Sequence, residues 1–86
     1  MTVLFYSGAL EYTDGARSYE SNDSQDIRSL IDELGCHFGS RLKDFLISGE
    51  NCLFLLNGKG LMAAGGLSAK LNPGDVVEVL PFIEAG

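Results

Sequence analysis

Three side chains in the sequence carry groups often used in nucleophilic or metal chemistry: Cys36, His37 and Cys52. His37 is the single histidine, and a structural zinc site needs four ligands, so these residues cannot complete one. Neither cysteine stands in a basic stretch that would favour its thiolate. The sequence therefore predicts that both thiols are small hydrophobic core groups, that His37 is solvated or caps a helix, and that no metal is bound.

Two further stretches could be mistaken for catalytic motifs. Asn57-Gly58-Lys59-Gly60 lacks the spacing and the Ser or Thr of a phosphate-binding loop, so a hairpin turn explains it better. Asp32 and Glu33 are neighbours in a predicted helix, where adjacent side chains do not face each other. They form a charged helix face rather than a carboxylate pair, and the internal residues predict no catalytic site.

Turn signals separate several runs of β-branched, aromatic and other apolar residues. Asp14-Gly15 and Asn57-Gly58 favour hairpin turns, and Pro73-Gly74 suits the two central positions of a turn before the last run. The predicted strands are Thr2–Leu10, Ala16–Glu20, Cys52–Leu56, a short return segment around Gly60–Met62, and Val76–Leu80.

One amphipathic helix dominates the middle of the sequence. It is predicted over Gln25–Gly35, with Asp23 or Ser24 as its N-cap and Gly35 at its C-terminus. A second, shorter helix is predicted over Arg41–Ile47. The apolar stripe of the first helix, at i, i+3, i+4 and i+7, is Ile27, Leu30, Ile31 and Leu34.

The order of these elements indicates an α+β fold. The first and last strands are apolar on both faces, which is typical of buried parallel strands, so we expect them side by side at the sheet centre. The result is a β-grasp, or ubiquitin-like, mixed sheet of four to five strands around one main helix. It is predicted over residues 1–81, with a flexible tail over 82–86. A split ferredoxin-like fold would need a long second helix that the sequence does not supply.

The last strand leads into an apolar tail. If Glu78 faces solvent, alternation directs Val77 and Val79 into the core and places Leu80 on the outer face with Glu78. An exposed Leu80 followed by the apolar residues 81–83 indicates a docking surface.

Three stretches resemble one family and together cover most of the chain. VLFYSGALEYTDGA is similar to its opening strand and hairpin, and LLNGKGL to its V-N-G-x-x-L element. LNPGDVVEVLPFIEAG is similar to its L-x-x-G-D-x-V-x-x-x-P-x-x-x-G-G ending. The family is that of the ubiquitin-like sulfur carriers, which includes the small subunit of molybdopterin synthase and the thiamine sulfur carrier.

The resemblance implies a non-catalytic carrier subunit rather than an enzyme. The carboxylate of Gly86 would be adenylated by a ubiquitin-activating-like adenylyltransferase, which uses ATP, and converted to a sulfur-donating thiocarboxylate. The carrier itself would bind no cofactor. The large subunit of molybdopterin synthase would then receive the tail. The residues implied for tail insertion are Pro81, Phe82, Ile83, Glu84 and Ala85, and those implied for the partner face are Tyr6, Leu61 and Leu80.

The resemblance leaves alternatives open. Ala85 stands where the family has glycine, and its added methyl group restricts the backbone. A thiamine-type carrier and a protein modifier joined through Gly86 to lysine use related chemistry. The segment from His37 to Glu50, which the shorter thiamine type lacks, favours the molybdopterin type. A β-grasp interaction module with an inert tail is the alternative from another class.

The charge of the chain bears on its partners and location. Twelve acidic and six basic residues give a net charge of −6, which disfavours nucleic-acid binding and favours a basic protein partner. No apolar run is long enough to span a membrane, and the first residues lack a signal-peptide pattern. A cytoplasmic location is therefore expected.

Overall fold

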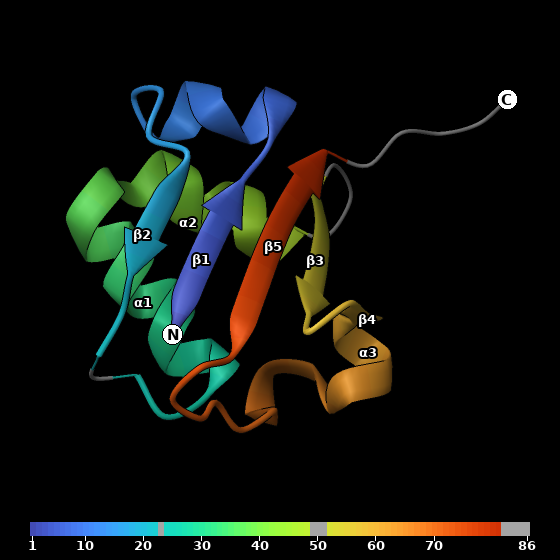
Figure 1. Ribbon diagram of the computed structural model, residues 1–86. Helices are drawn as coiled ribbons and strands as arrows, with labels where there is room; N and C mark the ends of the chain where they lie inside the picture. Colours follow the sequence, from blue (N-terminus) through green and yellow to red (C-terminus); the bar gives the residue numbers. More distant parts are fainter. Residues whose placement is uncertain (23, 49–51, 82–86) are drawn as a thin grey trace, which may run out of the picture.

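The structure, a computed structural model, describes residues 1–22, 24–48 and 52–81. Five strands form one sheet in the order β2-β1-β5-β3-β4, and α1 and α2 lie behind it in Figure 1. The elements are β1 (Thr2–Phe5), the 3-10 helix η1 (Ser7–Tyr12), β2 (Ser18–Glu20), α1 (Ile27–Phe38), α2 (Ser40–Ser48), β3 (Cys52–Leu56), β4 (Lys59–Gly60), α3 (Leu61–Ala64), the 3-10 turn η2 (Gly66–Ser68) and β5 (Val76–Pro81).

The first and last strands pair in parallel, as predicted. β5 is the middle strand of the sheet, with β1 on one side and the antiparallel β3 on the other. Val79 lies opposite Phe5 of β1 and Phe54 of β3, and all three side chains are buried. This arrangement confirms the mixed sheet of the β-grasp fold.

Helices cover one face of the sheet, which corrects one step of the sequence argument. The apolar content of β1 and β5 suggested burial on both faces, but side chains in β1 alternate between half-buried and buried. Leu4, Glu78 and Leu80 face away from the helices and remain partly exposed. The core behind the sheet includes Val3, Phe5, Ile27, Leu30, Ile31, Leu34, Leu42, Phe54, Val77 and Val79.

The main helix starts and ends later than predicted. Its N-cap is Asp26 rather than Asp23 or Ser24, and the Asp26 carboxylate accepts a 2.8 Å hydrogen bond from the Ser29 amide. Gly35 lies inside the helix rather than at its end. A Cβ there would come within 3.0 Å of the Lys43 Cβ, so Gly35 permits the close approach of α2. The helix instead ends before Gly39, whose φ of 116° suits glycine.

Three predicted strands are shorter than expected, and the second of them begins at Ser18 rather than at Ala16. The first ends at Phe5, and the chain then forms η1, which carries the fully buried Ala9 into the core. Its return to β2 is fixed by the Thr13 hydroxyl, which donates to the Ala16 carbonyl at 2.8 Å. The return segment predicted around Gly60–Met62 is the two-residue β4 followed by α3, because the chain turns into a helix at Leu61.

One carboxylate joins the main helix to the edge of the sheet. Glu33 of α1 accepts hydrogen bonds of 2.6 Å from the hydroxyls of Tyr19, Ser21 and Ser24. Burial alone would raise the pKa of Glu33, but these three donors outweigh it and hold the pKa below its ordinary value. Asp32 points elsewhere and pairs with Lys43 at 2.8 Å, so the two adjacent carboxylates act separately.

The Glu33 cluster predicts a pH-dependent stability difference. Because the folded state lowers the pKa of Glu33, its stabilisation is complete above the unfolded pKa of about 4.3 and is lost as the pH falls through the folded value. Glu33→Gln should therefore reduce the free energy of unfolding by about 1–3 kcal/mol at pH 7 and by less at pH 3. Urea unfolding of both proteins measures this, and an equal difference at the two pH values would contradict it.

Candidate functional site

Of the three side chains with nucleophilic or metal-binding groups, the structure describes Cys36 and His37. Cys36 is exposed on α1, so the prediction of a core thiol is wrong there, because the residue falls outside the buried stripe of the helix. The side chain of Cys52 is not among those that the structure describes. His37 is exposed and its ring contacts Tyr19 and Phe38 at centroid distances of 4.8 and 4.5 Å. The described ranges hold no cluster of His, Cys, Asp or Glu suited to a metal ion.

The Asn57-Gly58 segment is a hairpin turn, as predicted. Both residues have positive φ, 51° and 84°, and they connect β3 to β4. The Asn57 amide donates to the Asp75 carboxylate at 3.0 Å and accepts from the Val76 amide at 2.9 Å. The backbone amide of Asn72 and the side chain of Asn57 lower the pKa of Asp75. The turn therefore positions the start of β5.

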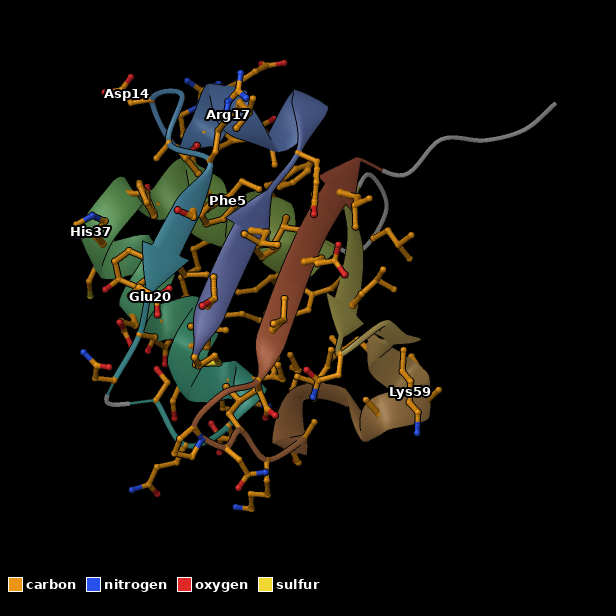
Figure 2. All side chains as sticks on the ribbon, in the orientation of Figure 1. Phe5, Asp14, Arg17, Glu20, His37 and Lys59 are labelled. Atoms are coloured by element: carbon orange, nitrogen blue, oxygen red, sulfur yellow. The ribbon has the colours of Figure 1, made fainter. Side chains whose placement is uncertain are left out.

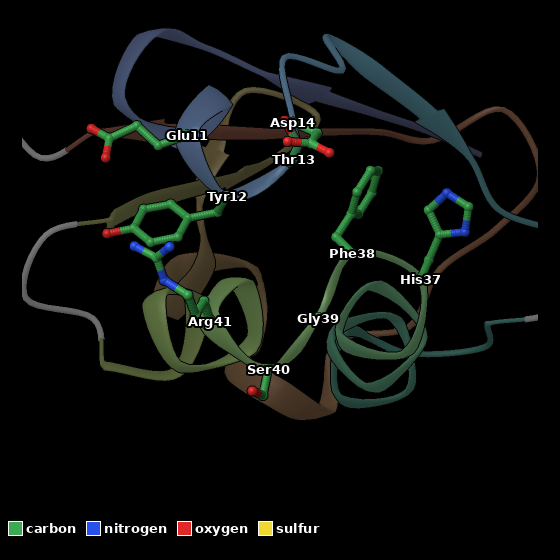
Figure 3. A pocket seen from close by; sticks show the side chains of 9 residues that line it. All are labelled: Glu11, Tyr12, Thr13, Asp14, His37, Phe38, Gly39, Ser40 and Arg41. Atoms are coloured by element: carbon green, nitrogen blue, oxygen red, sulfur yellow. The ribbon is translucent and has the colours of Figure 1, made fainter.

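A hollow of about 450 Å³ lies between η1 and the junction of α1 and α2 (Figure 3). Arg41 projects toward Tyr12, with its guanidinium carbon 5.4 Å from the ring centroid, and Tyr12 stacks on Phe45 at 4.7 Å. Glu11 and Asp14 also border the hollow. These contacts fasten η1 to α2, and they assemble no nucleophile with a base.

The face of the sheet opposite α1 and α2, here called the open face, has no helix packed on it in the described fold. Figure 2 views the molecule from this side, with Glu20 on the edge strand β2. Five apolar or aromatic residues from β1, β3, β5 and the residue after β1 form what we call the apolar patch. Its members are Leu4, Tyr6, Leu53, Leu55 and Leu80.

One row of the apolar patch crosses the sheet at the end of β5. Leu80 lies opposite Leu53 of β3. On the other side, the Tyr6 amide donates to the Val79 carbonyl at 3.0 Å, which places Tyr6 beside Leu80. Tyr6 and Leu53 are 38% and 39% exposed. The structure thus brings together two of the three partner-face residues that the sequence suggested.

A carboxylate lies in the next row of the same face. Glu78 is flanked by Leu4 of β1 and Leu55 of β3. The Tyr6 hydroxyl donates to Glu78 Oε2 at 2.9 Å, and this bond is the largest cause of the raised pKa of Tyr6. The outward position of Glu78 and the inward positions of Val77 and Val79 agree with the predicted alternation.

The third suggested residue, Leu61, lies beside the apolar patch rather than in it. As the first residue of α3 it packs partly on the core and lines an apolar groove of about 440 Å³. Leu53 lines the same groove, so it connects Leu61 to the row containing Leu80. The groove is bordered by Leu46, Ile47, Leu53, Phe54, Gly60, Leu61, Met62, Ala63 and Leu67.

The tail residues fall mostly outside the described chain. Pro81 is the last residue of β5 and lies opposite Cys52 of β3. The other residues implied for tail insertion, Phe82, Ile83, Glu84 and Ala85, and the terminal Gly86 are not described. The division between a domain over 1–81 and a tail over 82–86 therefore stays a prediction.

Comparison with known proteins decides the family. The model of the ThiS family matches residues 3–86, nearly the whole chain. The chain belongs to the ThiS family. It is therefore a ubiquitin-like sulfur carrier by family, as the three sequence stretches indicated. No curated protein sequence gives a significant match.

Solved structures show the same fold at low sequence identity. CysO in the Amycolatopsis orientalis BexX/CysO complex is 24% identical over 99% of this chain and 98% of that chain, with a TM-score of 0.82. Urm1 from Trypanosoma brucei is 22% identical over 99% and 93%, with a TM-score of 0.77. A putative molybdopterin converting factor, subunit 1, from Pyrococcus furiosus is 18% identical over 95% of each chain, with a TM-score of 0.67.

Leu53 and Leu55 of the apolar patch were not predicted from the sequence to lie on the open face. Leu53 and Leu55 were assigned only to an apolar strand, although the alternation used for β5 also applies to Cys52–Leu56. With Phe54 and Leu56 buried, Leu53 and Leu55 must lie on the open face. In the described ranges no helix combines the length and the hydropathy needed to cross a bilayer.

Proposed function

We propose that this ThiS-family chain carries sulfur as a thiocarboxylate on the carboxyl group of Gly86. The family match extends through the terminal residues, and the apolar patch lies at the end of β5, where the chain continues into the tail. That juxtaposition carries the proposal, because a partner covering the patch would stand beside the tail. The carrier would act in the cytoplasm and bind no cofactor of its own.

The terminal carboxylate must be activated before sulfur can enter. A carboxylate is a poor electrophile, so an oxygen of Gly86 attacks the α-phosphorus of ATP on the activating enzyme and releases pyrophosphate. A hydrosulfide ion then attacks the acyl carbon of the adenylate, AMP leaves, and the thiocarboxylate remains. The adenylyltransferase supplies the ATP site, while this chain supplies the docking surface and the reacting carboxylate. Small residues such as Ala85 and Gly86 suit entry into a narrow active site.

The apolar patch is the docking surface in this proposal. A contiguous apolar patch on a small domain commonly marks a protein interface, and its central residues contribute most of the binding energy. Tyr6 and Leu80 belong to the patch, and Leu61 extends it into the adjoining groove. The tail, Pro81 to Gly86, would enter the partner's active site once this surface is docked.

For the acceptor we propose the large subunit of molybdopterin synthase, as the resemblance implies. The likeness to the Pyrococcus molybdopterin converting factor supports a shared fold for that role. A different acceptor is the second candidate, because CysO, solved in complex with BexX, has the higher TM-score. Mixing thiocarboxylated carrier with each acceptor and its substrate separates the two, since only the true acceptor should consume the thiocarboxylate rapidly.

Activation itself is tested by pyrophosphate release. The adenylyltransferase and ATP should release pyrophosphate only when the full chain is added, at a rate that saturates with carrier concentration. Thiamine-type carriers and protein modifiers also begin with this step, so it tests activation and not the acceptor. An interaction module with an inert tail would bind a partner and release none, which would refute the proposal.

A further inference from the structure

Glu78 is an acidic residue that lies among the members of the apolar patch. Leu4 and Leu55 flank it across the sheet, and Tyr6 bonds to one of its oxygens. Among the described residues the single ion pair is Lys43–Asp32, so no basic side chain of the same chain neutralises Glu78. Arg17 lines a hollow beside Leu4 and Tyr6, but it forms no ion pair with Glu78.

A purely apolar partner would fit this surface poorly. Docking would remove water from Glu78, and a buried carboxylate without a charged partner is strongly unfavourable. The Tyr6 hydroxyl provides one hydrogen bond, whereas an ionised carboxylate has about four acceptor positions on its two oxygens. The partner must therefore bring further donors, and a positive charge, to the centre of the interface.

We propose that the partner places an arginine over Glu78, surrounded by apolar side chains that contact the patch; this inference rests on the proposed carrier function. A guanidinium offers several donors in one plane and is more weakly hydrated than a lysine ammonium, so it suits a desolvated site. It also stacks on aromatic rings, and the partly exposed Tyr6 ring stands beside the carboxylate. Tyr6 thus positions Glu78 and offers a stacking surface.

The inference is tested by binding the full-length chain to its adenylyltransferase. Glu78→Gln removes the charge and keeps the shape of the side chain. We expect it to weaken binding at least about tenfold, because the arginine would lose its partner on docking. The matched control is Glu20→Gln, which removes one negative charge from the same face of the sheet. Like Glu78, Glu20 accepts a hydrogen bond from a hydroxyl, here that of Thr2 at 2.7 Å. Glu20 lies on the edge strand β2 outside the patch, so binding should change less than about twofold.

Each result has a definite meaning. If Glu78→Gln binds as well as or better than the unchanged protein, the partner has no arginine there and the inference is wrong. Equal weakening by both substitutions would indicate general charge attraction and would also overturn it. Pyrophosphate release at saturating enzyme tests the carrier function separately, since both variants keep Gly86. If pyrophosphate is released but Glu78→Gln does not selectively weaken binding, only the arginine is rejected. If the unchanged protein neither binds the enzyme nor releases pyrophosphate, the arginine and the carrier function are both rejected.

Discussion

Replacing Leu80 with glutamate should weaken binding to the adenylyltransferase by about 3 kcal/mol, or more than a hundredfold in Kd. Leu80 lies in the row of the apolar patch nearest the tail, opposite Leu53. A docked partner would bury the new carboxylate without a cation of its own, and Glu78 on the same face of the strand would repel it. Isothermal titration of the full-length chain measures the loss. Leu80→Gln, which adds polarity without charge, should lose less.

The fold should survive this substitution. Leu80 is partly exposed, so we expect a small fall in Tm, whereas Val79→Glu would place a charge in the core and unfold the chain. The two adjacent positions therefore form a matched pair for thermal unfolding. If Leu80→Glu unfolds the protein, or leaves binding unchanged, the assignment of the patch as a docking surface is wrong.

Changing the terminal residue should have the largest effect on function. Deletion of Gly86 moves the carboxylate to Ala85, and addition of a tryptophan after Gly86 carries it beyond the position to be activated. Either change should reduce the rate of pyrophosphate release by about a thousandfold or more, because a misplaced reacting atom loses the benefit of orientation.

Two controls accompany these terminal variants. Both should still bind the enzyme, since the apolar patch is intact, so the loss should fall on the chemical step. Ala85→Gly restores the family residue and should preserve or increase the rate by relaxing the backbone. Normal release after deletion of Gly86 would show that the terminal carboxylate is not the reacting group.

Much of the fold is encoded in local patterns. The spacing of Ile27, Leu30, Ile31 and Leu34 specified the buried stripe of α1, and all four are buried as expected. The helix ends depended on tertiary contacts instead. Glycine is common at helix ends, but Gly35 lies inside α1. Its lack of a side chain leaves room for Lys43 of α2 to pack against the helix.

The candidate site was predictable in part. Alternation placed Leu80 and Glu78 on one face, but it could not show that Tyr6 from the other end of the chain bonds to Glu78. That contact depends on the parallel register of β1 and β5, which a single sequence does not specify. Cys36 is exposed because it lies on the side of α1 away from the buried stripe, and the helical spacing could have predicted this. The prediction followed instead the general tendency of free cysteines to be buried.

The central claim is tested most directly by the intact mass of the chain. The full-length protein is incubated with its adenylyltransferase, ATP and a sulfur donor, and then weighed without digestion. The account predicts a species about 16 Da heavier, the exchange of one carboxylate oxygen for sulfur, that requires ATP and is absent when Gly86 is deleted. An unchanged mass under conditions in which the chain binds the enzyme would contradict the carrier function.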